Sequence, residues 1–92
     1  AGTLSQEETM GDFYFETRNY EAALKQFEAA QKAGNDSRRL QKKIIVSKYN
    51  IGMGFIRRRQ YPAALQVMNE ILVIDPRNEH AFKKAKKLKK VM

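Results

Sequence analysis

The side chains best suited to catalysis or metal binding gather around a single histidine, His80. Asp75 and Glu79 lie near it in the sequence, and a carboxylate beside an imidazole can move a proton or hold a metal ion. Metal sites and covalent catalysis need several converging groups, however, and the chain has no cysteine and no second histidine. Carboxylates at a helix start also serve as caps and dipole partners. The sequence therefore predicts no catalytic residue, no metal site and no cofactor, and it indicates a protein that is not an enzyme.

Basic side chains form the second chemically distinctive group, and they lie in the C-terminal part of the chain. Residues 1–37 have a net charge of −4, whereas residues 38–92 have a net charge of +12. The run from Arg57 to Arg59 ends a predicted helix, where cations complement the helix dipole. The last predicted helix has a basic patch made of Lys83, Lys86, Lys87 and Lys90, with Lys84 and Lys89 beside them.

This basic patch allows more than one interpretation. It can be a solvated surface that keeps the helix soluble, or it can attract nucleic-acid phosphates or an anionic membrane surface. An acidic protein segment would be attracted equally well. The patch consists of lysine rather than arginine and has no interleaved aromatic residues for base stacking, which argues against nucleic acid but leaves it as an alternative.

Five amphipathic helices account for nearly the whole chain. Apolar residues recur at intervals of three and four, and short segments rich in Gly, Asn, Asp or Pro separate the periodic stretches. The predicted helices span about 5–17, 20–33, 37–58, 61–74 and 79–92. Because no strand pattern is present, the predicted fold class is all-α. Expected caps are a capping box from Ser5 to Glu8, then Asn19, Asp36 or Ser37, and Asn78, with Pro62 in the first turn of its helix.

The same spacing predicts which faces are buried. The first helix is expected to bury a stripe of Met10, Phe13, Tyr14 and Thr17. The last helix is expected to bury Ala81, Phe82, Ala85, Leu88 and Val91 or Met92. The third helix has two apolar stripes, formed by Leu40, Ile44, Ile51 and Phe55 and by Ile45, Tyr49, Met53 and Ile56.

An internal repeat organises these helices. Met10, Gly11 and Tyr14 recur as Ile51, Gly52 and Phe55, and Tyr20, Ala23 and Phe27 recur as Tyr61, Ala64 and Met68. Every pair is separated by the same 41 residues, which indicates two helical hairpins of common design. Glycine in the first helix and alanine in the second would let the two helices of each hairpin approach closely.

These residues resemble the tetratricopeptide repeat, whose pattern of Gly, Tyr, Ala and Phe they follow, with Pro76 at the end of the second copy. The resemblance implies one domain over residues 1–92, built as a right-handed superhelical array of antiparallel hairpins. The first repeat spans about 4–37, and the second spans about 45–78 with its first helix elongated from about 37. The helix over 79–92 is expected to cap the array, although it also suits the first helix of a truncated third repeat. Neither copy has the family's tryptophan.

The resemblance also implies a function in protein–protein interaction, as a scaffold or adaptor that holds a peptide or a partner helix in a concave groove. The elongated third helix resembles repeats of some co-chaperone prolyl isomerases. The groove residues implied are Asp12, Phe15, Tyr49, Asn50, Met53, Arg57 and Lys84. The stripe containing Tyr49 and Met53 suits equally a core that packs on the first and fifth helices.

A clamp for the C-terminal carboxylate of heat-shock chaperones, known from one subclass of this family, is incomplete here. Asn50 occupies one expected position, and His80 and Lys84 stand in for two others. Glu8 and Asp12 stand where the clamp has Lys and Asn, so two carboxylates would repel an incoming carboxylate.

Other functions remain open at this stage. The basic end could bind nucleic acid or a membrane surface, or the hairpins could self-associate into a homo-oligomer, because two repeats are few for an isolated array. The longest apolar stretches are too short for a transmembrane segment. The compartment is not determined by the sequence, with a cytoplasmic one favoured.

Overall fold

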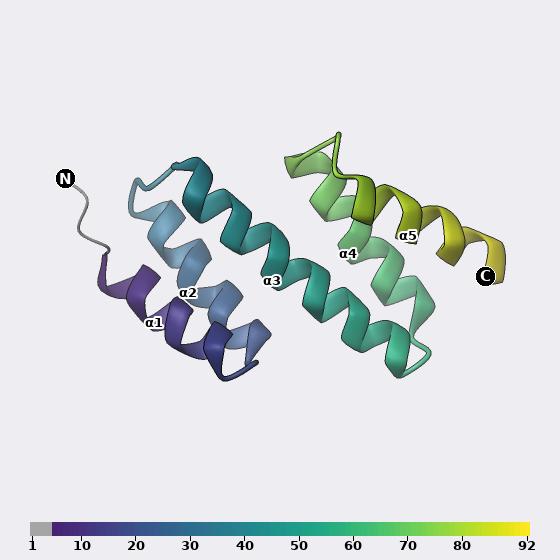
Figure 1. The fold of residues 1–92 in the computed structure, drawn as a ribbon, viewed down its shortest axis with the longest axis horizontal. Helices are drawn as coiled ribbons and strands as arrows, with labels where there is room; N and C mark the ends of the chain where they lie inside the picture. Colours follow the sequence, from purple (N-terminus) through teal and green to yellow (C-terminus); the bar gives the residue numbers. More distant parts are fainter. Residues whose placement is uncertain (1–4) are drawn as a thin grey trace. The chain divides into compact units, whose positions relative to one another are not determined.

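A computed structural model describes residues 5–92, and the five expected helices are present within them (Figure 1). Their bounds agree with the predicted ranges to within one residue at each end, and the described chain is all-α. The predicted start of the first repeat, at about residue 4, lies outside the described residues. The helices are α1 (Gln6–Glu16), α2 (Tyr20–Lys32), α3 (Arg38–Arg57), α4 (Tyr61–Ile74) and α5 (Glu79–Val91).

The helices pack in sequence as adjacent pairs and divide into two compact units, whose boundary lies between Ser47 and Lys48 within α3. The N-terminal unit contains α1, α2 and the first half of α3. The C-terminal unit contains the second half of α3, α4 and α5. Figure 1 shows α1 lying beside α2, and α4 beside α5, each pair joined by a short turn.

Side-chain caps start four of the helices where the sequence predicted them. The Ser5 and Ser37 hydroxyls accept the N–H groups of Glu8 and Leu40 at 3.1 and 3.2 Å. The Asn19 and Asn78 side-chain oxygens accept the N–H groups three residues further on, at 3.3 and 2.9 Å. Each bond satisfies a helix N–H that has no intrahelical partner. The fourth helix has no side-chain cap and begins with Pro62 in its first turn.

The two hairpins of the repeat are formed by α1 with α2 and by α3 with α4. The turns that join these helices lie 41 residues apart and have the same backbone geometry. Arg18 and Arg59 both adopt the left-handed conformation, with φ of 64° and 59°. The next N–H in each turn, from Asn19 or Gln60, donates to the carbonyl of Tyr14 or Phe55 at 2.8 Å. This six-to-one bond is typical of the Schellman motif, in which the left-handed position is usually glycine. The sequence repeat therefore corresponds to a repeat of local structure.

Replacing Arg59 with glycine is expected to stabilise the protein by about 0.5–1 kcal/mol, because a residue with a Cβ pays a steric cost at positive φ. The end of α2 uses glycine at the same position of the motif, Gly34 with φ of 110°. Urea denaturation measures the change, and Lys25→Gly, at an exposed position in the middle of α2, is the control that should instead destabilise by a similar amount. A destabilised Arg59→Gly variant would mean that the arginine side chain stabilises this turn.

Glycine lets the two helices of each hairpin approach closely, as predicted. A Cβ built on Gly11 would overlap the ring of Phe27, and a Cβ on Gly52 would lie 2.6 Å from the terminal methyl of Met68. Phe27 and Met68 are fully buried, 41 residues apart like the glycines they contact. The small residues Ala23 and Ala64 are also fully buried in the corresponding second helices.

The predicted stripe of α1 is wrong in its rotation, and that of α5 is only partly confirmed. In α1 the buried residues are Glu8 and Gly11, whereas Met10 and Phe13 from the predicted stripe are 39% and 58% exposed. The close contact of Gly11 with Phe27 sets this rotation, because only the side of α1 without a side chain fits against the ring. In α5 the residues Ala81, Ala85 and Leu88 are buried as expected, but the predicted Phe82, Val91 and Met92 are exposed.

Candidate functional site

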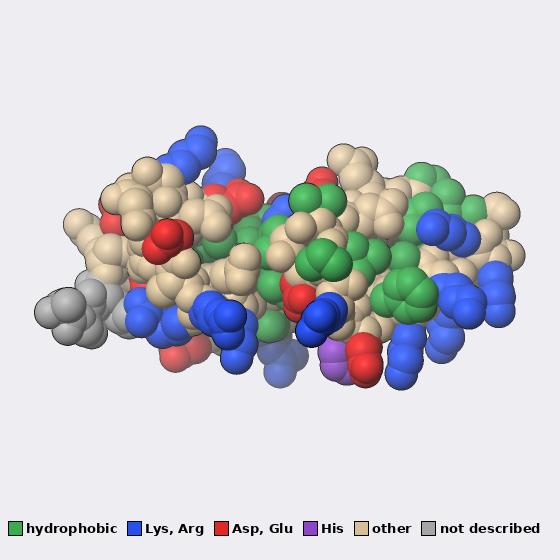
Figure 2. Space-filling view, turned by 90° about the horizontal axis from the view of Figure 1, so that it is seen from above, with side chains coloured by type: hydrophobic (Ala, Val, Ile, Leu, Met, Phe, Trp, Pro, Cys, Tyr) green, Lys and Arg blue, Asp and Glu red, His purple; other side chains and the backbone are tan. Residues whose placement is uncertain are grey.

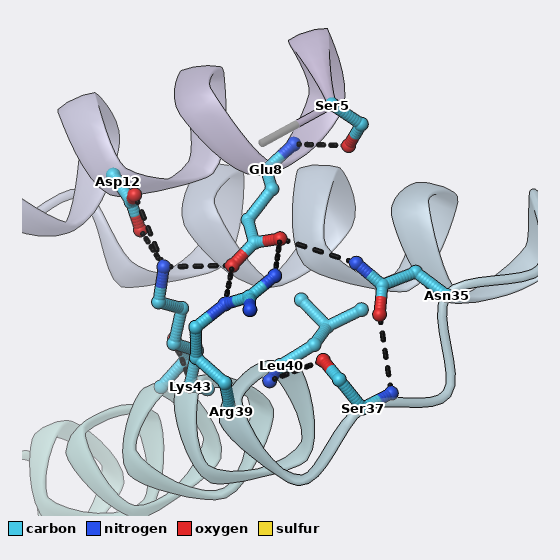
Figure 3. A network of polar contacts seen from close by, with 9 residues as sticks. Ser5, Glu8, Asp12, Asn35, Ser37, Arg39, Leu40 and Lys43 are labelled. Carbon is cyan, nitrogen blue, oxygen red and sulfur yellow. Dashed lines mark hydrogen bonds and ion pairs between the residues drawn. The ribbon is translucent and has the colours of Figure 1, made fainter. Parts of the chain in front are cut away.

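A fully buried carboxylate joins α1 to the first turns of α3 in the N-terminal unit (Figure 3). Its two oxygens accept a bidentate pair of bonds from Arg39, both at 3.0 Å. The Lys43 ammonium donates to Glu8 at 2.8 Å, and the Asn35 amide donates at 3.2 Å. Glu8 therefore has four donors around a side chain that has no exposed surface, which meets the requirement that a buried charge be paired and hydrogen-bonded.

The electrostatics of this cluster hold Glu8 in its charged form. Hydrogen bonds from Arg39, together with the bond and charge of Lys43, lower the pKa of the Glu8 carboxyl from its ordinary 4.5 to about 2 against the opposing effect of burial. Asp12 lies one turn after Glu8 in α1 and forms a second ion pair with Lys43, at 2.9 Å. Burial opposes the charge on Lys43, but its bonds to Asp12 and Glu8 prevail and the pKa of Lys43 is raised.

Local sequence explains how these side chains meet. Glu8 and Asp12 are four residues apart in α1, and Arg39 and Lys43 are four residues apart in α3, so each pair lies on one side of its helix. The side-chain oxygen of Asn35, Oδ1, accepts the Ser37 N–H at 3.1 Å, which directs the Asn35 side-chain NH2 group toward Glu8. This complementary spacing of two carboxylates and two cations is the signal by which the sequence could have revealed the cluster.

The cluster corrects two expectations about Glu8. Ser5 accepts the Glu8 N–H as a capping box requires, but the Glu8 carboxylate is bonded to the α3 side chains instead of completing the box. The expectation that Glu8 and Asp12 would repel a ligand carboxylate assumed that both charges are unpaired. Glu8 is buried and both carboxylates are paired with cations, so neither presents an uncompensated charge.

Next to this cluster lies a hollow of about 230 Å³ at the junction of α1, α2 and α3. Two residues predicted to line a groove, Asp12 and Phe15, meet here. The apolar lining comes from Phe15, Phe27 and Val46, and Val46 is 44% exposed. We call this feature the α1–α3 hollow, lined by Asp12, Phe15, Phe27, Lys42, Lys43 and Val46.

The other predicted groove residues belong to the C-terminal unit. Tyr49 is half-buried, and its ring packs edge-on against His80 of α5 with centroids 6.1 Å apart. Met53 and Asn50 are half-buried in α3, and Arg57 is exposed at the end of that helix. Lys84 is half-buried on α5. Tyr49 therefore contacts the fifth helix, as expected if this stripe packs into a core, and a binding role for these residues stays a prediction.

The predicted basic patch lies on the surface of α5. Lys83, Lys86, Lys87 and Lys90 are exposed. Among residues 5–92, no group of three or more His, Cys, Asp or Glu side chains is arranged to hold a metal ion. No helix in the same range is long and apolar enough to cross a membrane.

Three features of the chain bear on its classification: five helices in an all-α arrangement, packing in sequence as adjacent pairs, and a hairpin geometry that recurs after 41 residues. The sequence predicted the recurrence and two residues of the α1–α3 hollow, Asp12 and Phe15. It did not indicate Arg39 and Lys43 as partners of Glu8, or Lys42 and Val46 as residues of the hollow. Comparisons of the chain with protein-family models, with curated proteins and with solved structures find no match.

Proposed function

We propose that the protein is a protein-interaction module of the tetratricopeptide type, which binds an apolar side chain of a peptide or partner helix in the α1–α3 hollow. The observation that carries this proposal is the hollow itself, where Phe15 and Val46 form an apolar lining beside charged side chains. The stacking of the hairpins into a superhelix and a co-chaperone-like role are part of the proposal.

The chemistry of the α1–α3 hollow suits an anchor residue of a partner. Interfaces concentrate their binding energy where an apolar or aromatic side chain fills a pocket and polar groups surround it. Here Phe27 forms a rigid floor, since it is fully buried against Gly11. Lys42 is exposed at the edge and can pair with a carboxylate of the partner, whereas Lys43 already pairs with Asp12 and Glu8.

The recurrence of hairpin geometry supports the tetratricopeptide assignment within this proposal. Both hairpins place a first-helix glycine against a buried large residue of the second helix, and both turns have a left-handed arginine. Binding modules built from such repeats keep the hairpin constant and vary the residues on their exposed surfaces. The proposal is thus for a scaffold that presents a binding surface, rather than for an enzyme.

Selection from a displayed library of random peptides tests this function without a known partner. Peptides that bind the intact protein should bind Phe15→Ala at least about tenfold more weakly, because the α1–α3 hollow loses its aromatic lining. Phe13→Ala is the matched control, since Phe13 is in the same helix, is 58% exposed and lies outside the hollow. The affinities of the selected peptides for Phe13→Ala should differ from those for the intact protein by less than about twofold.

Thermal unfolding of both variants separates binding from folding. The proposal predicts that Phe15→Ala loses affinity while it still unfolds cooperatively near the temperature of the intact protein. If no peptide is enriched, or if the enriched peptides bind Phe15→Ala as well as the intact protein, the α1–α3 hollow is not the binding site.

A further inference from the structure

The whole net charge of the protein belongs to its C-terminal unit. Residues 48–92 include eleven basic and three acidic side chains, whereas residues 1–47 include seven of each. The N-terminal unit is therefore neutral at pH 7, with His80 uncharged, and the C-terminal unit has the full +8. Long-range attraction to an anionic partner must act on the C-terminal unit.

Most of this charge is displayed along α5. Figure 2 shows basic side chains gathered in the region where Figure 1 places α5, with hydrophobic side chains among them. The helix packs through Ala81, Ala85 and Leu88, so its outward surface consists mainly of lysines. Within residues 5–92, the ion pairs are formed by Arg39, Lys43 and Lys48, and the α5 lysines take part in none of them.

Exposed apolar side chains lie beside these lysines. Phe82 is 59% exposed, and it shares one side of α5 with Lys86 and Lys89 because they follow at intervals of four and three. Three residues further, Met92 is 59% exposed and lines a shallow hollow with Val73 of α4, which is 83% exposed. We call the surface of α5 formed by Phe82, Lys86 and Lys89 the Phe82 side, and Met92 and Val73 lie near its C-terminal end, where Met92 follows Lys89 by three residues.

We propose that the Phe82 side of the C-terminal unit binds an anionic membrane surface. Lysines would pair with lipid headgroups while Phe82, Val73 and Met92 enter the boundary between headgroups and acyl chains. A bilayer surface uses both kinds of side chain at once. A nucleic acid would pair with the lysines but would gain little from Val73 or Met92, and only one aromatic residue is available for stacking on a base.

The carboxylates of the C-terminal unit do not cancel this attraction. Glu70 lines the same shallow hollow as Val73 but is paired with Lys48 at 2.9 Å. Asp75 accepts the N–H of Arg77 in the turn before α5. Glu79 is exposed in the first turn of α5, three residues before Phe82, where an acid complements the helix dipole, and the six lysines of α5 outnumber this one carboxylate.

Sedimentation with lipid vesicles tests the proposal on the intact chain. We expect binding to vesicles of phosphatidylcholine mixed with phosphatidylserine, little binding to phosphatidylcholine alone, and weaker binding as salt is raised. Reversing two charges, Lys86→Glu with Lys89→Glu, should weaken binding by about tenfold or more. The matched control, Lys25→Glu with Lys32→Glu on exposed sites of α2, changes the net charge equally and should leave binding within about twofold.

The apolar part of the contact needs its own variant. Phe82→Ser should reduce vesicle binding about fivefold without changing its salt dependence, because Phe82 is exposed and is not part of the core. Equal binding to both kinds of vesicle, or equal losses for the α2 control, would overturn the proposal. The proposal would also be overturned if polyglutamate or duplex DNA bound as tightly as the vesicles and Phe82→Ser changed none of these affinities. The surface would then attract any polyanion. Peptide selection on the intact protein, with Phe15→Ala as the variant, tests the other function separately.

Discussion

Replacing Gly11 with alanine is expected to destabilise the protein by about 2 kcal/mol, which lowers the melting temperature of a chain this size by roughly 10 °C. The added methyl group would overlap the ring of Phe27. That ring is fully buried and stiff, so it cannot give way as the end of a flexible side chain can. The helices of the first hairpin would have to move apart, and the packing of α1 on α2 would loosen.

The sign of this effect makes it diagnostic. Alanine normally stabilises a helix interior relative to glycine by about 1 kcal/mol. Gly54 in α3 is the matched control, because a methyl group there would meet only the guanidinium ends of Arg57 and Arg58, at 3.8 Å. Gly54→Ala should therefore stabilise the protein while Gly11→Ala destabilises it.

The change in stability caused by Gly52→Ala should lie between those caused by Gly11→Ala and Gly54→Ala. Its added methyl would lie 2.6 Å from the terminal methyl of Met68, a flexible end that can shift more easily than a ring. Gly52→Ala should consequently cost less than Gly11→Ala, and Gly52→Leu should cost more than either. Urea denaturation followed by circular dichroism measures all four variants. If Gly11→Ala stabilises the protein as Gly54→Ala does, the close contact of α1 with Phe27 does not exist.

Local signals in the sequence were sufficient to predict where the helices begin and end. Caps such as Asn19 and Asn78 act on N–H groups three residues away, so their effect does not depend on distant parts of the chain. The repeat of 41 residues also allowed one tertiary contact to be predicted. It identified Gly11 and Gly52 as points where the helices of each hairpin approach closely, without identifying the residues that they contact.

The rotation of α1 could not be predicted from its own composition. A count of apolar residues favours Met10 and Phe13 as the buried side, yet the helix buries Gly11, which has no side chain, and Glu8, which is charged. Burial of Glu8 depends on Arg39 and Lys43, more than thirty residues away. Phe15 was predicted as a groove residue from the resemblance, and it lines the α1–α3 hollow.

The length of the third helix explains where these cations come from. α3 has 20 residues, whereas α1 has 11. Arg39 and Lys43 belong to the first two turns of α3, and both bind Glu8. The start of this long helix thus supplies the partners of the only fully buried carboxylate among the described residues.

Replacing Glu8 with glutamine is expected to destabilise the protein by about 3 kcal/mol at neutral pH, because Arg39 and Lys43 would lose the charge that compensates them. The intact protein should lose a similar amount in acid. Its Glu8 pKa is lowered to about 2 when folded, from 4.5, so this stabilisation is complete above about pH 5 and is lost as the pH falls toward 2. Glu8→Gln should lack this part of the acid dependence.

Denaturation in urea at a series of pH values measures both effects, and hydrogen exchange locates them. Amide protection should fall first in α1 and in the first half of α3, which Glu8 joins. Glu16→Gln is the control, an exposed carboxylate in the same helix whose removal should change stability by less than about 0.5 kcal/mol. Equal stability of Glu8→Gln and the intact protein at every pH would mean that the cost of burying Glu8 cancels its ion pairs, leaving α1 attached to α3 by apolar packing alone.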